Sequence, residues 1–155
     1  MEYNVRVLAP EVLMEPLLSL LEEAEAVPLV ISGSSMTPFL VHGRDKVLLS
    51  KPRRPLKKGD MILYRRAGGA YVLHRICRCR GNTYSLVGDG QYLIESGIRN
   101  RQVLAVVTAV RRKGKLLRPG SACWMFFQHI WLILRPVRPY ITGVYERLRA
   151  GSRRK

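Results

Sequence analysis

The sequence predicts a mainly β protein with a compact antiparallel β core, an N-terminal amphipathic helix, and a C-terminal helical segment that is apolar and basic. Three observations carry this prediction. Short apolar and β-branched runs alternate with glycine turns between residues 27 and 111. A leucine-rich amphipathic pattern precedes these runs, and an aromatic apolar stretch follows them. The chain has 155 residues, which is enough for one domain with a buried core.

Residues 10–26 have the periodicity of an amphipathic helix, with leucines on one side and glutamates on the other. Pro16 either kinks this helix or marks a later start. The segment is too short and too charged to span a bilayer. Acidic residues also interrupt every apolar run before Val27, so no secretory signal pattern is expected. We therefore expect residues 1–30 to form a helix that leads into the core.

Six runs have the character of β-strands, and turn signals separate them. The turn at residues 67–70, Ala-Gly-Gly-Ala, is typical of a hairpin. Short strands joined by glycine turns indicate an antiparallel core, which we place at residues 31–115. The predicted strands are residues 27–32, 45–49, 61–64, 71–78, 84–87 and 103–111.

Residues 122–134 are apolar at eleven of thirteen positions. A helix that spans a bilayer needs roughly twenty such residues, so a spanning helix is the least favoured interpretation. Two tryptophans, two phenylalanines and flanking arginines suit a segment that lies among lipid headgroups. The same pattern equally suits a helix packed on the β core. Both interpretations stay open for the C-terminal segment, residues 116–155.

The charge of the chain is strongly basic and uneven. Lys and Arg number 27 and Asp and Glu number 11, for a net charge of +16. Residues 1–30 carry six acidic residues and one basic residue, whereas residues 111–155 carry twelve basic residues and Glu146 alone. We expect the later part of the chain to meet an anionic partner, namely a membrane surface through residues 118–155. Nucleic acid is the less favoured partner.

The three cysteines do not form a metal-site pattern. Cys77 and Cys79 lie two positions apart on a predicted strand and share a face, but no second pair follows. We expect these two residues and Cys123 to be reduced, which suits a reducing compartment. No metal or organic cofactor is implied.

A polar turn at residues 32–37 carries a candidate nucleophile. It follows the first predicted strand and is stopped by Pro38, which leaves a serine hydroxyl at the rim of the sheet. A serine hydroxyl is a poor nucleophile without a base. His74, on a later strand, is the candidate base. At its usual pKa of about 6.5 the imidazole is largely neutral near pH 7 and accepts a proton readily.

Four short motifs in this order resemble the S24/S26 peptidases, which include type I signal peptidases and self-cleaving repressors. The resemblance implies an antiparallel fold of the signal peptidase or LexA-like type, with the serine at the edge of a substrate groove. It implies Ser35 as the nucleophile and His74 as the base, as in the archaeal and endoplasmic-reticulum signal peptidases. The motifs are Gly33-x-Ser35-Met36-x-Pro38, Lys58-Gly59-Asp60-Met61-Ile62, His74-Arg75-Ile76 and Gly88-Asp89.

Other parts of the catalytic apparatus depart from the family pattern. Relatives with histidine usually carry an aspartate several residues after the Gly-Asp motif, and none follows here. Asp89 and Glu95 are the candidates for a third member that orients the imidazole. The backbone N–H of Ser35 is the expected oxyanion donor, and the hydroxyl of Ser34 or Ser32 is a candidate second donor.

These features predict a serine endopeptidase with a Ser-His mechanism, dedicated to the maturation of a precursor or leader peptide. Because no apolar N-terminal span precedes the β core, we expect a cytoplasmic protein, peripheral at the inner face of the membrane. The alternative is a non-catalytic basic β-module that binds nucleic acid, with tyrosines as stacking surfaces. That alternative does not explain why Ser35 and His74 occupy positions that match the motifs of the peptidase family.

Overall fold

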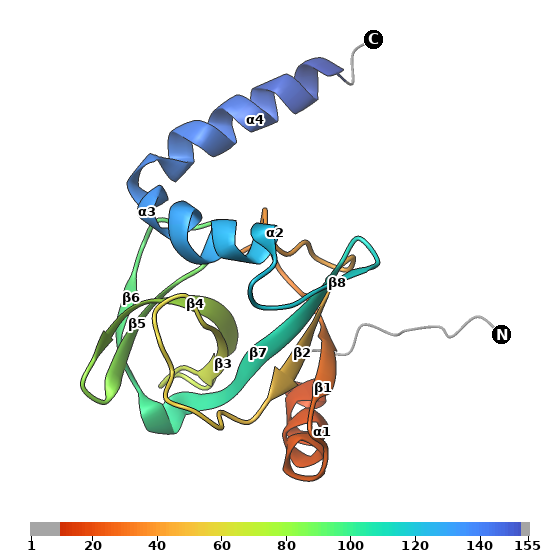
Figure 1. The fold of residues 1–155 in the computed structure, drawn as a ribbon, viewed down its shortest axis with the longest axis vertical. Helices are drawn as coiled ribbons and strands as arrows, with labels where there is room; N and C mark the ends of the chain where they lie inside the picture. Colours follow the sequence, from red (N-terminus) through yellow and green to blue (C-terminus); the bar gives the residue numbers. More distant parts are fainter. Residues whose placement is uncertain (1–9, 153–155) are drawn as a thin grey trace, which may run out of the picture.

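The computed structural model describes residues 10–152, and its architecture is an open antiparallel sheet with helices before and after it (Figure 1). The strand order is β1-β2-β7-β3-β4-β5-β6, with β8 paired to β7. The mainly β class and its flanking helices are thus confirmed. The strands are β1 (Val27–Val30), β2 (Lys46–Ser50), β3 (Met61–Arg65), β4 (Tyr71–Arg80), β5 (Thr83–Val87), β6 (Glu95–Arg99), β7 (Val103–Arg112) and β8 (Lys115–Leu117).

The six predicted strands are present, and two further strands were not predicted. In β6 only Ile98 is buried, and Gly97 has a positive φ of 80°, so the strand lacks an apolar alternation. β8 pairs with β7 through a tight turn in which Lys113 and Gly114 both have positive φ. Pairing with a neighbouring strand, more than intrinsic propensity, places both segments in the sheet.

The N-terminal helix α1 (Pro10–Glu23) is three residues shorter than the predicted 10–26, and Pro16 lies inside it. Its apolar stripe packs on the sheet through Met14, Leu17 and Leu21, which are all buried. Glu15, Glu22 and Glu23 lie on the exposed side of the helix, as the amphipathic pattern predicts.

The C-terminal segment forms a broken helical layer over the same core. Trp124, Phe127 and Trp131 are buried in the cluster that also holds the apolar face of α1. The inner side of residues 122–134 therefore packs on the β core, and its outer side stays exposed. The elements are α2 (Ala122–Met125), a π-helical turn η2 (Phe126–Ile130), α3 (Trp131–Ile133), a 3-10 turn η3 (Arg135–Val137) and α4 (Arg138–Ser152).

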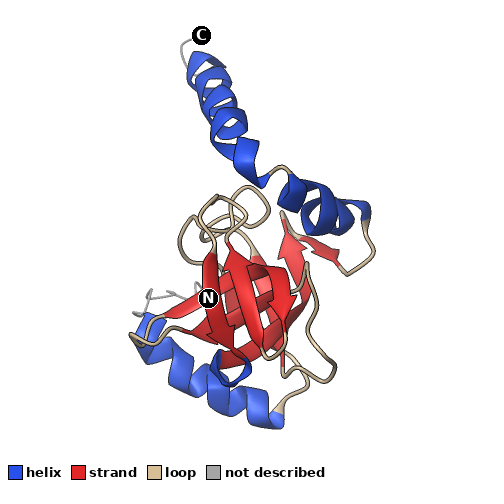
Figure 2. Ribbon diagram, turned by 90° about the vertical axis from the view of Figure 1, so that its left-hand side faces the viewer, coloured by secondary structure: helices blue, strands red, loops and turns tan. Residues whose placement is uncertain are grey.

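Helix α4 projects away from the sheet, on the side opposite α1 (Figures 1 and 2). In their described portions, the segments at residues 1–30, 31–115 and 116–155 all contribute to one buried cluster. Within residues 10–152, no helix has both the length and the apolarity required to cross a bilayer.

Candidate active site

Ser35 lies in the loop between β1 and β2, half-buried against the Gly-Asp-Gly turn that follows β5. Its carbonyl oxygen accepts a hydrogen bond from the Gly90 N–H at 2.8 Å. A Cβ atom built at Gly88 would lie 2.4 Å from that same oxygen, and one at Gly90 would lie 2.6 Å from the carbonyl oxygen of Thr37. Only glycine permits so close an approach of two backbones. The glycines on both sides of Asp89 therefore hold the Ser35 loop in place.

His74 lies on β4 at the wall of a cleft of about 340 Å³. The side chains of Arg66 and His74 line this cleft together with residues 90–95. Gly90 thus borders the cleft and also holds the Ser35 carbonyl. Ser35 and His74 are linked through this turn, but Ser35 is not among the residues that line the cleft, and among the described residues no hydrogen bond joins the two side chains.

One nitrogen of the His74 imidazole, Nδ1, lies close to the hydroxyl group of a tyrosine. Nδ1 of His74 lies 3.3 Å from the hydroxyl oxygen of Tyr64, and that hydroxyl lies 2.6 Å from Oε2 of Glu95. A phenol has one proton, and Tyr64 donates it to the carboxylate. The hydroxyl oxygen is then left to accept from Nδ1–H. This assignment leaves Nε2 of His74 unprotonated, as a general base requires.

Glu95 is held as a carboxylate at the mouth of the cleft. Arg66 donates to it from Nε at 3.0 Å and from Nη2 at 2.8 Å. Burial by itself would raise the pKa of Glu95, but the hydrogen bonds from Arg66 and Tyr64 outweigh it and lower the pKa. Burial, and then the bond to Glu95, raises the pKa of Tyr64. Glu95 therefore stays charged and Tyr64 stays protonated near neutral pH.

The environment of His74 makes it a weaker base than a free imidazole. The residue is only 3 % exposed, and burial, followed by the positive charge of Arg66, lowers its pKa to about 4. The negative charges of Glu95 and Asp89 oppose this shift only in part. The usual pKa of about 6.5 therefore does not apply to His74, because burial disfavours the imidazolium. The ring is neutral at pH 7, which a general base requires.

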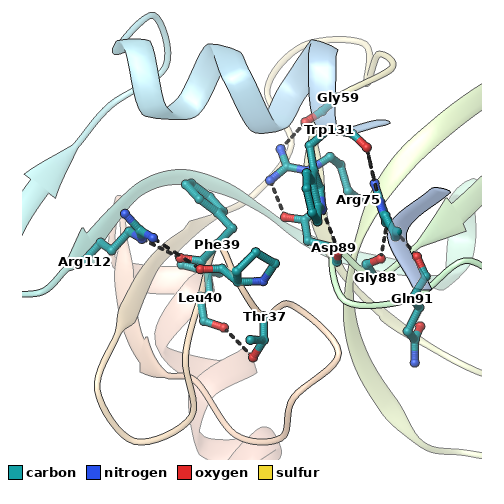
Figure 3. A network of polar contacts seen from close by, with 12 residues as sticks. Thr37, Phe39, Leu40, Gly59, Arg75, Gly88, Asp89, Gln91, Arg112 and Trp131 are labelled. Carbon is teal, nitrogen blue, oxygen red and sulfur yellow. Dashed lines mark hydrogen bonds and ion pairs between the residues drawn. The ribbon is translucent and has the colours of Figure 1, made fainter. Parts of the chain in front are cut away.

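Asp89 lies in a second polar centre, which is fully buried (Figure 3). Its two oxygens accept from Nε of Arg75 at 2.9 Å and from Nη2 at 2.7 Å. Nη1 of Arg75 donates to the carbonyl of Gly59, and the guanidinium lies 5.2 Å from the ring centroid of Phe39. Arg75 thus joins residues from or next to all four sequence motifs.

The two candidates for a third member are therefore placed differently. Asp89 is engaged on both oxygens by Arg75. Glu95 reaches the imidazole through the hydroxyl of Tyr64. An indirect chain of His74, Tyr64 and Glu95 takes the place of a direct carboxylate contact.

The candidate oxyanion donors lie in the Ser35 loop. Among residues 10–152, the Ser35 N–H has no hydrogen-bond acceptor, so it is available to a substrate oxygen. The carbonyl of Ser34 accepts from the Thr37 N–H at 3.0 Å, which closes the turn. The side chain of Ser34 is exposed, and in the described part of the chain its hydroxyl makes no hydrogen bond.

Tyr64 is the residue that the sequence analysis missed as part of this site. The pairing of β3 with β4 sets Ile62 opposite His74 and Tyr64 opposite Val72. Tyr64 is therefore the diagonal neighbour of His74 on the same face of the sheet, within reach of an aromatic side chain. The hairpin turn at residues 67–70, which the sequence predicts, determines this register. The contact between Tyr64 and His74 could therefore have been inferred from the sequence.

The described residues hold no group of three His, Cys, Asp or Glu side chains suited to a metal ion. Cys77, Cys79 and Cys123 are all free. Comparison of the sequence with models of protein families and with curated proteins finds no match.

Proposed function

We propose that this chain is a serine endopeptidase of the signal peptidase-like class, with Ser35 as the nucleophile and His74 as the general base. The observation that carries the proposal is the chain of contacts from Nδ1 of His74 through the Tyr64 hydroxyl to Glu95. With the proton on Nδ1, Nε2 is the basic nitrogen, and His74 lines a cleft together with Gly90, whose N–H binds the Ser35 carbonyl. The four motifs that resemble the S24/S26 peptidases support the same assignment.

The first chemical step follows from these positions. Oγ of Ser35 attacks the carbonyl carbon of the scissile bond, and its proton passes to Nε2 of His74. The imidazolium formed then donates from Nδ1 to Tyr64, and the charge of Glu95 stabilises it across the phenol. The backbone N–H of Ser35 donates to the carbonyl oxygen as it becomes negative.

The later steps return the enzyme to its starting state. The imidazolium gives the Nε2 proton to the leaving amine, the C–N bond breaks, and an ester remains on Ser35. Neutral His74 then takes a proton from water, whose oxygen attacks the ester, and the proton returns to Ser35 as the acid product leaves. A catalytic hydrogen bond is often loose in a free enzyme and tightens when substrate binds. A direct bond from Ser35 to His74 is therefore required only in the substrate complex.

The cleft suits an extended peptide. Residues 91–94 border it outside any strand, and Leu93 is 71 % exposed. Among the described residues, the main chain of Leu93 and Ile94 has no hydrogen-bond partner. A substrate strand that adds to this edge by main-chain bonds meets these unpaired groups. Small side chains before the cut, and a precursor or leader peptide as substrate, follow from the resemblance.

The place of action is part of the proposal. The C-terminal segment exposes apolar side chains on its outer side, and its residues Arg118 and Arg147 are exposed as well, which supports a peripheral position on a membrane surface. A peptidase in this position meets precursors that are themselves membrane-associated.

A fluorophosphonate probe tests the catalytic assignment. We expect the wild-type chain to be labelled at Ser35, Ser35→Ala to remain unlabelled, and His74→Ala to react about 10²–10⁴-fold more slowly. Ser19→Ala, on the exposed side of α1, serves as the matched control and keeps the wild-type rate. Equal labelling of Ser35→Ala and wild type would refute the nucleophile. A chain that resists the probe but binds nucleic acid with a steep salt dependence would instead be the basic β-module.

A further inference from the structure

An apolar stripe runs along the outer side of the C-terminal segment. Successive members are separated by one, three or four positions, which is the spacing of an exposed helical face, and they run from the end of α2 into α4. Trp124, Phe127 and Trp131 alternate with the first of them and point into the core, so the stripe is the opposite face of the segment. Its exposed members are Met125, Phe126, Ile130, Ile133, Val137, Tyr140, Ile141 and Val144.

These side chains are too exposed and too contiguous to be scattered surface residues. Ile133 is 72 % exposed and Tyr140 is 77 % exposed. The principal packing partner of α4 is the neighbouring turn η3, so the sheet does not cover this face. Large contiguous apolar surfaces of this kind mark interaction sites.

The charge around the stripe indicates what covers it. Residues 111–155 contain twelve basic residues and one acidic residue, and Arg118 and Arg147 are exposed. The exposed glutamates of α1 lie at the opposite end of the molecule (Figure 1). The part of the chain that carries the stripe is therefore strongly basic, and an anionic surface attracts it.

A second copy of this chain fits the stripe poorly. Each copy carries a net charge of +16, and residues 111–155, which include the stripe, contribute +11 of it. Two copies joined through the stripe would bring like charges together. An anionic bilayer offers both an apolar phase for the stripe and negative headgroups for the arginines.

We propose that the C-terminal stripe docks on an anionic lipid bilayer and lies among the headgroups. This inference rests on the proposed place of action and specifies which surface of the protein binds the membrane and which lipid charge it prefers. It does not require Ser35 to be a nucleophile. The inner side of the same segment holds the turn that borders the His74 cleft. Nε1 of Trp131 donates to the Asp89 carbonyl at 2.7 Å, and Nη1 of Arg135 donates to the Tyr92 carbonyl at 2.6 Å. Docking therefore fixes the cleft close to the lipid surface.

Vesicle flotation with the full chain tests the proposal. The probes are vesicles of equal parts phosphatidylglycerol and phosphatidylcholine, and vesicles of phosphatidylcholine alone. We expect binding to the anionic vesicles, weakening as salt rises, and little binding to the neutral ones. Changing Ile130→Ser and Ile133→Ser together should reduce partitioning by roughly tenfold to a hundredfold, because two apolar side chains no longer enter the bilayer.

Leu20→Ser is the matched control, since Leu20 is 52 % exposed on α1 and Ile130 is 51 % exposed on the stripe. It should bind like wild type, and all variants should keep the wild-type urea midpoint. The proposal is overturned if the anionic vesicles do not bind the chain, or if the paired isoleucine variant binds as well as Leu20→Ser. A dimer that the isoleucine variant dissociates would assign the stripe to a second copy instead. Ser35→Ala should float like wild type, so the flotation result tests lipid binding even if the catalytic proposal fails.

Discussion

Two arginine–carboxylate pairs lie on opposite faces of β4, and they differ in exposure. Arg75 and Asp89 are both 0 % exposed, whereas Arg66 is 44 % and Glu95 is 29 % exposed. Successive residues of a strand point to opposite faces, so His74 faces the Arg66–Glu95 pair, while its neighbour Arg75 pairs with Asp89 on the other face. In the buried pair, both carboxylate oxygens are engaged by the arginine. In the half-exposed pair, one oxygen also accepts from Tyr64.

The buried carboxylate of Asp89 stabilises the fold, whereas the half-exposed carboxylate of Glu95 interacts with the imidazole of His74 through Tyr64. A fully desolvated ion pair ties distant loops together, and removing one partner leaves an unpaired charge in the interior. A half-exposed pair contributes little to stability because water screens it. It leaves the Glu95 carboxylate at the cleft, where its charge acts on His74 through a single hydroxyl. Each of the following changes tests one side of this contrast.

The largest effect is expected from Asp89→Asn, which leaves the guanidinium of Arg75 buried without its counter-charge. We expect a loss of about 3–5 kcal/mol in the free energy of unfolding, measured by urea denaturation. Glu95→Gln should cost less than about 1 kcal/mol, because its pair is screened by solvent. Similar losses in the two variants would contradict the division between a structural and a functional carboxylate.

The second effect is a pH dependence of stability caused by His74. Its pKa is about 4 in the folded chain and about 6.5 when unfolded, so the unfolded state binds more protons between these values. The contribution is fully present above about pH 6.5 and is lost as the pH falls toward 4, by about 3 kcal/mol in total. Urea midpoints across this window should fall in the wild type and change much less in His74→Phe. Equal slopes in both would show that the imidazole is not buried in its neutral form.

The third and smallest effect concerns the reaction rate. Tyr64→Phe and Glu95→Gln should each slow fluorophosphonate labelling by about tenfold to a hundredfold, because the Nδ1–H tautomer is no longer held. The acid limb of the labelling rate should lie near pH 4 in the wild type. It should move lower in Glu95→Gln, since the charge of Glu95 raises the pKa of His74. A rate change without this movement would indicate a structural role only.

The strand pattern was largely predictable because apolar alternation and glycine turns are local signals. The strands β6 and β8 were missed because a neighbouring strand recruits them, and Ile98 is the single buried residue of β6. In the C-terminal segment, the apolar pattern suited both packing on the core and a position among lipid headgroups. In the structure Trp131 is buried in the core cluster, so the inner face of the segment packs on the core. Tyr64 was missed because its role depends on the register of the β3–β4 pairing.

The sequence by itself determined the class of the sheet, the N-terminal helix, the uneven charge and the positions of Ser35 and His74, since these depend on local pattern and composition. Only the tertiary structure decided which carboxylate reaches the imidazole, what pKa the imidazole has, and which side of the C-terminal segment is exposed. These properties arise from burial and from contacts between residues far apart in the chain. His74 and Glu95 are joined through Tyr64 because three strands bring them together, and desolvation at that point lowers the pKa of His74.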